Sequence, residues 1–108
     1  MTALNRLAAE IHDNAVAHGF WEGERNFGEQ IALMHSELSE ALEEHRAGRP
    51  NEYTLSYKTK PEGVAVELAD CLIRILDSMA ALNVDIDGVV ARKVAYNASR
   101  PFKHEKAY

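Results

Sequence analysis

The segment from Glu62 to Leu82 constrains the fold more than any other part of the chain, because it is apolar over most of a helical circumference. Its apolar residues leave no polar stripe wide enough to face water along the whole segment: Val64, Val66, Leu68, Leu72, Ile73, Ile75, Leu76, Met79 and Leu82. A helix of this kind has to be covered on several sides. The segment is therefore predicted to lie at the centre of a helical bundle.

Three further segments place apolar residues at helical intervals, and they predict helices over Ala3–His18, Glu29–Ala47 and Ile86–Ser99. Gly48 supplies a stop signal after the second helix, and Asp85 is positioned to cap the last one. No strand pattern competes with these helices. The predicted fold class is all-α, with a four-helix arrangement.

Two segments are predicted to be loops. The first, GFWEGERNFG from Gly19 to Gly28, holds three glycines and three aromatic residues, so it is a turn with bulky side chains to place. The second, from Arg49 to Pro61, has no sustained period and is bracketed by two prolines. It is expected to contain a short extended piece at most.

A length of 108 residues, of which 46% are hydrophobic, predicts one domain over residues 1–108 with a modest core. No apolar run approaches the roughly 18 residues that a membrane span requires, and the first residues mix charged and apolar side chains too evenly for a secretory signal. A soluble, cytoplasmic protein without membrane partners is expected. The single cysteine, Cys71, lies among apolar residues and is predicted to be a buried, inert thiol.

The charge of the chain is unevenly distributed. The net charge of -5 argues against a binder of nucleic-acid polymers, which needs a positive surface. Residues 91–108 nevertheless carry a charge of +4, since Glu105 is the one acid among five basic residues: Arg92, Lys93, Arg100, Lys103 and Lys106. One interpretation is an anion-binding end beside a cation site. The alternative is a solvated basic tail.

Two acidic pairs recur with the same spacing. Glu37 and Glu40, in HSELSEALEEH, fall along one side of a helix, which a charged solvent face would explain. Glu67 and Asp70, in VAVELADCLIRIL, repeat this spacing inside the most apolar segment of the chain. Two carboxylates in such surroundings are costly to desolvate unless a positive charge accompanies them. The second pair therefore favours a functional interpretation.

If the two helices are antiparallel neighbours, the four carboxylates can converge, and each close pair would repel by about 4 kcal/mol at about 4 Å with an effective dielectric constant near ~20. Divalent cations would neutralise this repulsion, and all-oxygen ligands favour Mg²⁺ or Mn²⁺. A di-iron or di-manganese carboxylate site would instead want Glu-x-x-His pairs. None of the five histidines has a glutamate three residues before it, which disfavours that alternative.

These motifs together resemble a known pattern. ELSE at 37–40, ELAD at 67–70 and KVAYNASR at 93–100 are similar to the signature of the MazG-like branch of the all-α nucleoside triphosphate pyrophosphatases. The resemblance covers about Phe20 to Lys103. The first motif alone carries little weight, whereas the three in this order form a fairly specific set. The resemblance implies a MazG-like four-helix bundle completed by oligomerisation, as a homodimer or tetramer.

The resemblance also implies a function. This is the Mg²⁺-dependent hydrolysis of a nucleoside or deoxynucleoside triphosphate between its α and β phosphates, with Mn²⁺ as a substitute metal. The products are a monophosphate and pyrophosphate, and the cellular role is house-cleaning of damaged nucleotides or control of a nucleotide pool. Carried over by position, the catalytic metal ligands would be Glu37, Glu40, Glu67 and Asp70, and the groups holding the phosphates or sugar would be Lys93, Asn97 and Arg100.

Two aromatic residues are further candidates for substrate contacts. Trp21, with its neighbours Phe20 and Phe27, offers a face for a nucleobase, and such stacking is worth about 1–3 kcal/mol per base. The alternative is that these aromatics cover the core. Tyr96, next to Asn97, is a candidate for the sugar or simply packs.

One departure from the family pattern keeps other functions open. Many members carry an acid where this chain has Ser36, so its role is vacant here or passes to Glu44, Glu43 or His35. A nucleotide-binding module without turnover is one alternative to the enzyme. A helical interaction protein whose acids are structural is another, and it predicts no dependence on metal.

Overall fold

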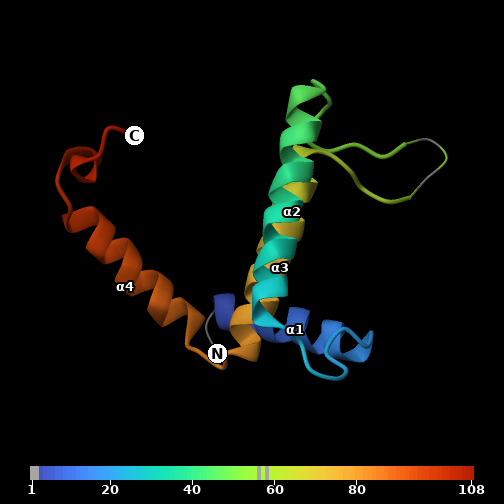
Figure 1. Cartoon of the computed structure of the whole chain (residues 1–108), viewed down its shortest axis with the longest axis horizontal. Helices are drawn as coiled ribbons and strands as arrows, with labels where there is room; N and C mark the ends of the chain where they lie inside the picture. The colour runs from blue at the N-terminus through green and yellow to red at the C-terminus, as the bar shows by residue number, and fades with distance from the viewer. Residues whose placement is uncertain (1–2, 56, 58) are drawn as a thin grey trace.

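The structure is a computed structural model that describes residues 3–55, 57 and 59–108 (Figure 1). It contains four α-helices and a short 3-10 helix, which are α1 (Ala3–Ala17), α2 (Phe27–Arg46), α3 (Val64–Ala81), α4 (Ile86–Ser99) and η1 (Phe102–Glu105). Within these described ranges there is no strand, and the one isolated β-bridge joins Tyr53 to Glu62. The prediction of an all-α chain is confirmed for this part of the sequence.

Capping side chains set where two of the helices begin. Asn26 accepts a hydrogen bond from the backbone N–H of Glu29, at 3.2 Å, so α2 starts at Phe27 and not at Glu29 as expected. Asp85 accepts one from the N–H of Gly88 at 3.2 Å, which confirms the predicted cap of α4. Each cap satisfies an N–H group that the first helical turn leaves unpaired.

The start of α3 was predicted two residues too early, because the preceding segment is held in a hairpin-like turn. Tyr53 and Glu62 exchange two backbone hydrogen bonds of 2.9 and 2.8 Å, so Glu62 is not free to join the helix. Gly63 follows with a φ of +121°, where a Cβ atom would collide with the carbonyl oxygen of Asn51. A glycine is required at this point, and α3 begins one residue later.

Helices α2 and α3 run antiparallel and side by side, and α1 crosses the end of α3 (Figure 1). The buried core lies where α1, α3 and the start of α4 meet, and it is formed by Ala8, Leu76 and Ile86 with Leu4, Ile11, Met79 and Ala80 packed against it. Hydrogen bonds support this junction, since the backbone N–H groups of Leu4 and Asn5 donate to Asp87 at 3.3 and 2.9 Å.

Helix α4 diverges from this core at an angle, so that its C-terminal half lies apart from α2 and α3 (Figure 1). The radius of gyration is 16.6 Å, whereas a compact chain of this length has about 13 Å. The four helices of one chain therefore do not close into a four-helix bundle.

A contiguous apolar face runs along one side of the α2–α3 pair. Viewed along each helix axis from its N-terminus, the apolar stripe is rotated by about a quarter of a turn from the residues that contact the other helix. The rotation has the same sense on both helices. In an antiparallel pair this puts both stripes on the same side. We call this surface the apolar face, and its residues are Ile31, Leu38 and Leu42 of α2 and Leu68, Leu72 and Ile75 of α3, all exposed. The predicted covering of α3 on several sides is not met within one chain.

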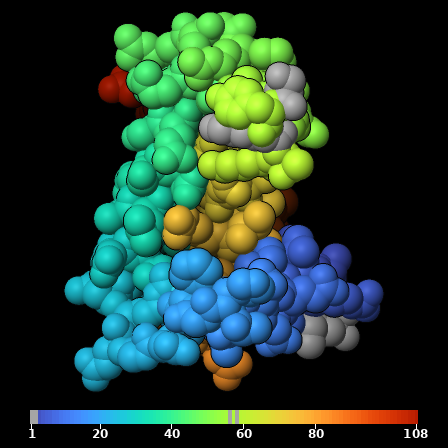
Figure 2. All heavy atoms as spheres, turned by 90° about the vertical axis from the view of Figure 1, so that its right-hand side faces the viewer, coloured from blue at the N-terminus to red at the C-terminus, as the bar shows by residue number. Residues whose placement is uncertain are grey.

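On a side away from the apolar face, neighbouring segments cover α3, so that only part of the helix is visible (Figure 2). Figure 2 shows α3 between the segment that follows α2, above, and α1 with its following loop, below.

Cys71 is buried, as predicted, and its Sγ–H donates to the carbonyl of Met34 at 3.6 Å. Among the described residues, no helix is both long and apolar enough to cross a membrane.

Candidate functional site

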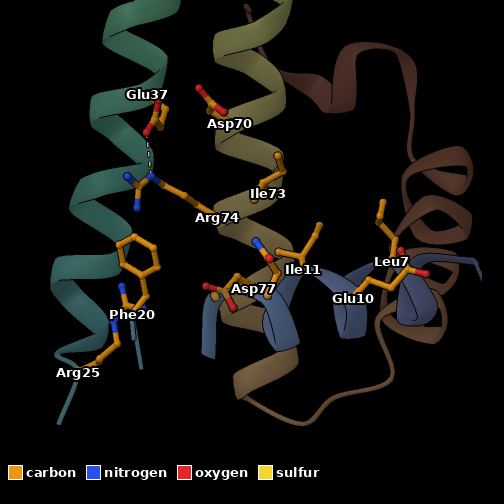
Figure 3. Close-up of a pocket in the computed structure, with 12 residues that line it drawn as sticks. Leu7, Glu10, Ile11, Phe20, Arg25, Glu37, Asp70, Ile73, Arg74 and Asp77 are labelled. Carbon is orange, nitrogen blue, oxygen red and sulfur yellow. Dashed lines mark hydrogen bonds and ion pairs between the residues drawn. The ribbon is translucent and has the colours of Figure 1, made fainter. Parts of the chain in front are cut away.

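Three of the predicted metal ligands meet between α2 and α3. Glu37, Glu67 and Asp70 each place one carboxylate oxygen so that the three atoms lie within 4.8 Å of one another. Figure 3 shows Glu37 and Asp70 facing each other across the two helices. Because α2 and α3 are antiparallel neighbours, residues distant in sequence converge here, as the spacing predicts. We call these three residues the acidic cluster.

Glu67 is the most buried member of the acidic cluster. Its side chain belongs to a residue that is 9% exposed, and its Oε2 atom has no hydrogen-bond partner among the described residues. The pKa of Glu67 is raised from 4.5 to about 7, first by burial and then by a hydrogen bond to Glu40 and the negative charges of Glu40, Asp70 and Glu37. A buried carboxylate oxygen without a partner is costly when the group is ionised, which is consistent with the raised pKa of Glu67.

Glu40, the fourth predicted ligand, lies beside the cluster and is exposed. It interacts with both Glu37 and Glu67 through side-chain hydrogen bonds. It does not share the close approach of the other three oxygen atoms. Glu40 is thus placed at the rim of the cluster, within reach of the same space.

An arginine that sequence reasoning did not single out balances part of this charge. Arg74, one helical turn after Asp70, donates from Nε to Oε1 of Glu37 at 2.8 Å. Burial alone would raise the pKa of Glu37, but the hydrogen bonds from Arg74 and Glu40 and the charge of Arg74 lower it below its ordinary value. The signal for Arg74 was present, since it is the only cation within the apolar α3 sequence.

Asp70 shows the opposite balance. Burial and the negative charge of Glu37 raise its pKa, and the positive charges of Lys60 and Arg74 offset part of this rise. Lys60 belongs to the segment between α2 and α3, so that segment brings a second cation toward the cluster. The acidic cluster is therefore a net negative site with two cations at its edge.

A cavity of about 530 Å³ extends from the acidic cluster toward α1. Its lining includes Glu37, Asp70 and Arg74 at one end and Phe20, Arg25 and Asp77 at the other (Figure 3). Cavities that hold small ligands in proteins measure about 300–1,000 Å³. The space is of the size of a small-molecule site, with an anionic end and an end that offers an aromatic ring.

Trp21, the predicted base contact, does not line this cavity. Its indole N–H donates to both oxygens of Asp77, at 3.0 and 3.1 Å, and the guanidinium of Arg25 lies 4.3 Å from its ring centroid. The Nδ1 atom of His12 lies 2.8 Å from the same carboxylate. Trp21 thus ties the α1–α2 loop to α3, and its neighbour Phe20 is the aromatic residue on the cavity.

The predicted phosphate-binding residues gather on α4. Lys93 Nζ lies 4.9 Å and Arg100 Cζ lies 5.5 Å from the centroid of the Tyr96 ring, and Asn97 stands one turn after Lys93. These residues form a basic group of their own on a helix that diverges from α2 and α3 (Figure 1). The structure does not bring them to the acidic cluster of the same chain. We call residues 86–108 the basic arm.

The three candidates for the role left by Ser36 differ in their surroundings. Glu44 accepts hydrogen bonds from the Tyr53 hydroxyl at 3.0 and 2.9 Å and from Arg49 at 3.2 Å, so it anchors the segment after α2. Glu43 and His35 are exposed. Glu44 therefore has a structural task, whereas Glu43 and His35 stay open as candidates for that role.

Comparison with protein-family models, with curated proteins and with solved structures finds no match to this chain.

Proposed function

We propose that this protein is a metal-dependent nucleoside or deoxynucleoside triphosphate pyrophosphohydrolase. The observation that carries the proposal is the unpartnered Oε2 of buried Glu67, inside a cluster of three carboxylates at the end of a cavity of nucleotide size. Ionised Glu67 in that position would be stabilised by a cation, and an open cavity beside the cation would give a polyphosphate access to it.

The donor set suits Mg²⁺, with Mn²⁺ as a substitute, because hard divalent ions prefer oxygen ligands. Glu37, Glu67 and Asp70 would hold the ion, with Glu40 at the rim, and so few protein ligands leave room for water and phosphate oxygens. The chemistry that such a cation supplies when bound is neutralisation of phosphate charge and a lowered pKa for a bound water.

The chain's own residues then orient the reaction. With a cation held there, the acidic cluster would lie at the phosphate end of the substrate, and the end of the cavity near Phe20 would accept the nucleoside. The water oxygen would form a bond to the α phosphorus and lose a proton to the solvent, while the bond from that phosphorus to the oxygen bridging to the β phosphorus breaks and the pyrophosphate leaves with its electron pair. The products are a nucleoside monophosphate and pyrophosphate. Positioning and charge neutralisation account for most catalysis of this kind.

We further propose that the working protein is a homo-oligomer whose site is shared between chains. The apolar face of α2 and α3 has the composition of a surface that a second copy covers, since large exposed apolar patches are rare on monomers. The basic arm, which is +4 over residues 91–108, would then lie over the acidic cluster of a neighbouring chain. Lys93, Asn97 and Arg100 would hold the leaving pyrophosphate there.

The first test is pyrophosphate release from a panel of standard, deoxy and modified nucleoside triphosphates, with Mg²⁺, with Mn²⁺ and with a chelator. We expect release that requires metal and gives the monophosphate as the second product. Release that continues in the chelator would contradict the proposal, and so would phosphate as the product in place of pyrophosphate.

One observation favours a second function, a nucleotide-binding module without turnover. Ser36 stands where the resembled pattern has an acid, and Glu44 is engaged by Tyr53 and Arg49, so only the exposed candidates Glu43 and His35 are left on α2 to orient the attacking water. Binding of metal and nucleotide without release would support this function. If no metal binds at all, a helical interaction protein remains, with the apolar face as its contact surface.

A further inference from the structure

We propose that Arg74 has two partners in turn: it is the counter-ion of Glu37 while the site is free of metal, and it binds the α phosphate of the substrate once a divalent cation takes Glu37. This inference rests on the proposed function and assigns a phosphate-binding residue that the acidic motifs do not contain. It follows from where Arg74 lies, from its unused hydrogen-bond donors and from the charges around it.

The position of Arg74 lets it serve both partners. The side chain of Arg74 is 38% exposed, whereas that of Glu37 is 12% exposed, so Arg74 extends from the more buried acidic cluster toward solvent. Only Nε–H is used, in the bond to Glu37, and neither terminal nitrogen donates to any residue that the structure describes. The remaining N–H groups are available to a ligand in the cavity, which Arg74 itself lines.

Charge determines which partner Arg74 takes. Without metal, Arg74 is the only cation bonded to Glu37 among the described residues, and it also lowers the pKa of Asp70. A divalent cation on these carboxylates would repel the nearby guanidinium and draw away the negative charge that holds it. The bond between Arg74 and Glu37 weakens as a result, and the guanidinium gains from turning to an anion in the cavity.

A substrate bound in the cavity would place an anion, its α phosphate, near Arg74. Arg74 lies between the acidic cluster and the end that holds Phe20 and Arg25 (Figure 3). A substrate with its polyphosphate at the carboxylates and its nucleoside near Phe20 passes Arg74 with its α phosphate. The planar guanidinium donates two parallel hydrogen bonds to a phosphate, which an ammonium group cannot match.

The test compares Arg74→Gln and Arg74→Lys with the unchanged protein in two calorimetric titrations. The first uses Mn²⁺ alone, and the second uses the α,β-imido triphosphates of the four deoxynucleosides in saturating Mn²⁺. Arg46→Gln is the matched control, since Arg46 is an exposed arginine in the last turn of α2 and lines no part of the cavity.

The two titrations should move in opposite directions for Arg74→Gln. Mn²⁺ alone should bind about fivefold more tightly, because a competing positive charge is gone. The nucleotide analogue should bind at least about tenfold more weakly, because a charged bidentate contact is lost. Arg74→Lys should keep the original affinity for Mn²⁺ and recover only part of the affinity for the analogue. Arg46→Gln should change neither.

Two results would overturn the inference while leaving the proposed function standing. If both affinities fall together in Arg74→Gln, Arg74 merely holds Glu37 in place. If the analogue binds equally well to all variants, Arg74 does not meet the phosphate. Failure of the unchanged protein to bind Mn²⁺ is a different result, and it would overturn both the proposed function and the role of Arg74.

Discussion

The two halves of the molecule are built from similar helices but differ in what holds them. Helices α1 to α3 pack on each other and are tied by side chains, as where Asp77 of α3 accepts from Trp21 and lies against His12. The basic arm is capped at its start by Asp85 and touches α1 there, yet beyond that point it stands away (Figure 1). Val94 in its middle is 61% exposed.

The difference shows that local helix signals and burial are separate properties. Both halves have a cap, a helical period and an apolar stripe, and these suffice to define a helix. Only the first half finds a surface for its stripe within the chain. The apolar stripe of the basic arm and the apolar face of α2 and α3 are both uncovered within one chain. The proposed oligomer would cover both surfaces.

The largest expected effect is at the buried carboxylate. Glu67→Gln removes the charge of a metal ligand and keeps its shape, so it should reduce metal-dependent pyrophosphate release to background while the helical circular dichroism is retained. Glu29→Gln, at an exposed position in the first turn of α2 away from the cavity, is the control and should keep full activity. Full activity in Glu67→Gln would remove the acidic cluster from the mechanism.

Substitutions in the basic arm should reduce activity nearly as much, and they should act on the site of a neighbouring chain. The double variant Lys93→Gln with Arg100→Gln should lose about a hundredfold in kcat/KM, since two charged phosphate contacts disappear. When it is mixed with Glu67→Gln and the chains exchange, one complete site forms in each mixed dimer. Activity should return to about a quarter of the unchanged protein. Mixing without recovery would show that each arm serves its own chain.

The next effect is on assembly. Leu72 lies on the apolar face and is 49% exposed in the single chain, so Leu72→Glu should leave the helices intact and place a charge in the proposed interface. Light scattering at micromolar concentration should give the mass of one chain for this variant and a multiple of it for the unchanged protein. Ala69→Glu, an exposed position on another side of α3, should stay assembled. A single-chain mass for the unchanged protein would contradict the assembly.

A smaller effect is the response of stability to pH in the absence of metal. The pKa of Glu67 is raised to about 7 from 4.5, so the folded state holds this proton more tightly than the unfolded state does. Below the unfolded value both states are protonated, and between the two values the unfolded state ionises first. The free energy of unfolding should therefore fall by about 1–3 kcal/mol across this window.

The matching variant isolates this contribution. Glu67→Gln cannot ionise, so the difference in unfolding free energy between it and the unchanged protein should grow from about pH 5 to pH 8. Denaturant unfolding at several pH values measures this difference. Mg²⁺ should restore the stability of the unchanged protein at pH 8 and leave the variant nearly unaffected. A difference that does not vary with pH would mean that Glu67 is not held protonated.

The smallest effect concerns the segment between α2 and α3. Tyr53→Phe removes the hydroxyl that donates to Glu44, so it should cost about 1 kcal/mol of unfolding free energy. Thermal unfolding measures this cost, and metal affinity should stay unchanged. A large loss of metal binding would instead show that this anchor positions Lys60 or the start of α3.

Much of the fold could be predicted from sequence because the signals are local. The caps, the glycine stops and the apolar period determine four helices to within about two residues. The errors have specific causes. Glu62 belongs to a bridge with Tyr53, a pairing nine residues apart that no local pattern announces, and the departure of α4 depends on contacts that a period does not specify.

The site divides in the same way. Convergence of Glu37, Glu67 and Asp70 could be predicted, since equal spacing on two neighbouring helices brings the pairs together. Arg74 was missed, and Trp21 rather than its neighbour Phe20 was put first among the aromatic residues, because which side chains line the cavity depends on where they turn after packing. The base contact assigned to Trp21 and the phosphate contacts assigned to α4 stay predictions, and only a second chain offers the latter a route to the cluster.

The small core described for one chain has a consequence for how the protein behaves at different abundances. Among the described residues the buried core cluster is Ala8, Leu76 and Ile86, so a separate chain would be modestly stable and the shared apolar face of the proposed oligomer would add to its stability. Assembly would then add to the stability of the folded chain by mass action, and the thermal midpoint would rise with protein concentration. Synthesis level alone would switch the activity: dilute chains would be mostly unpaired and inactive, and concentrated ones complete.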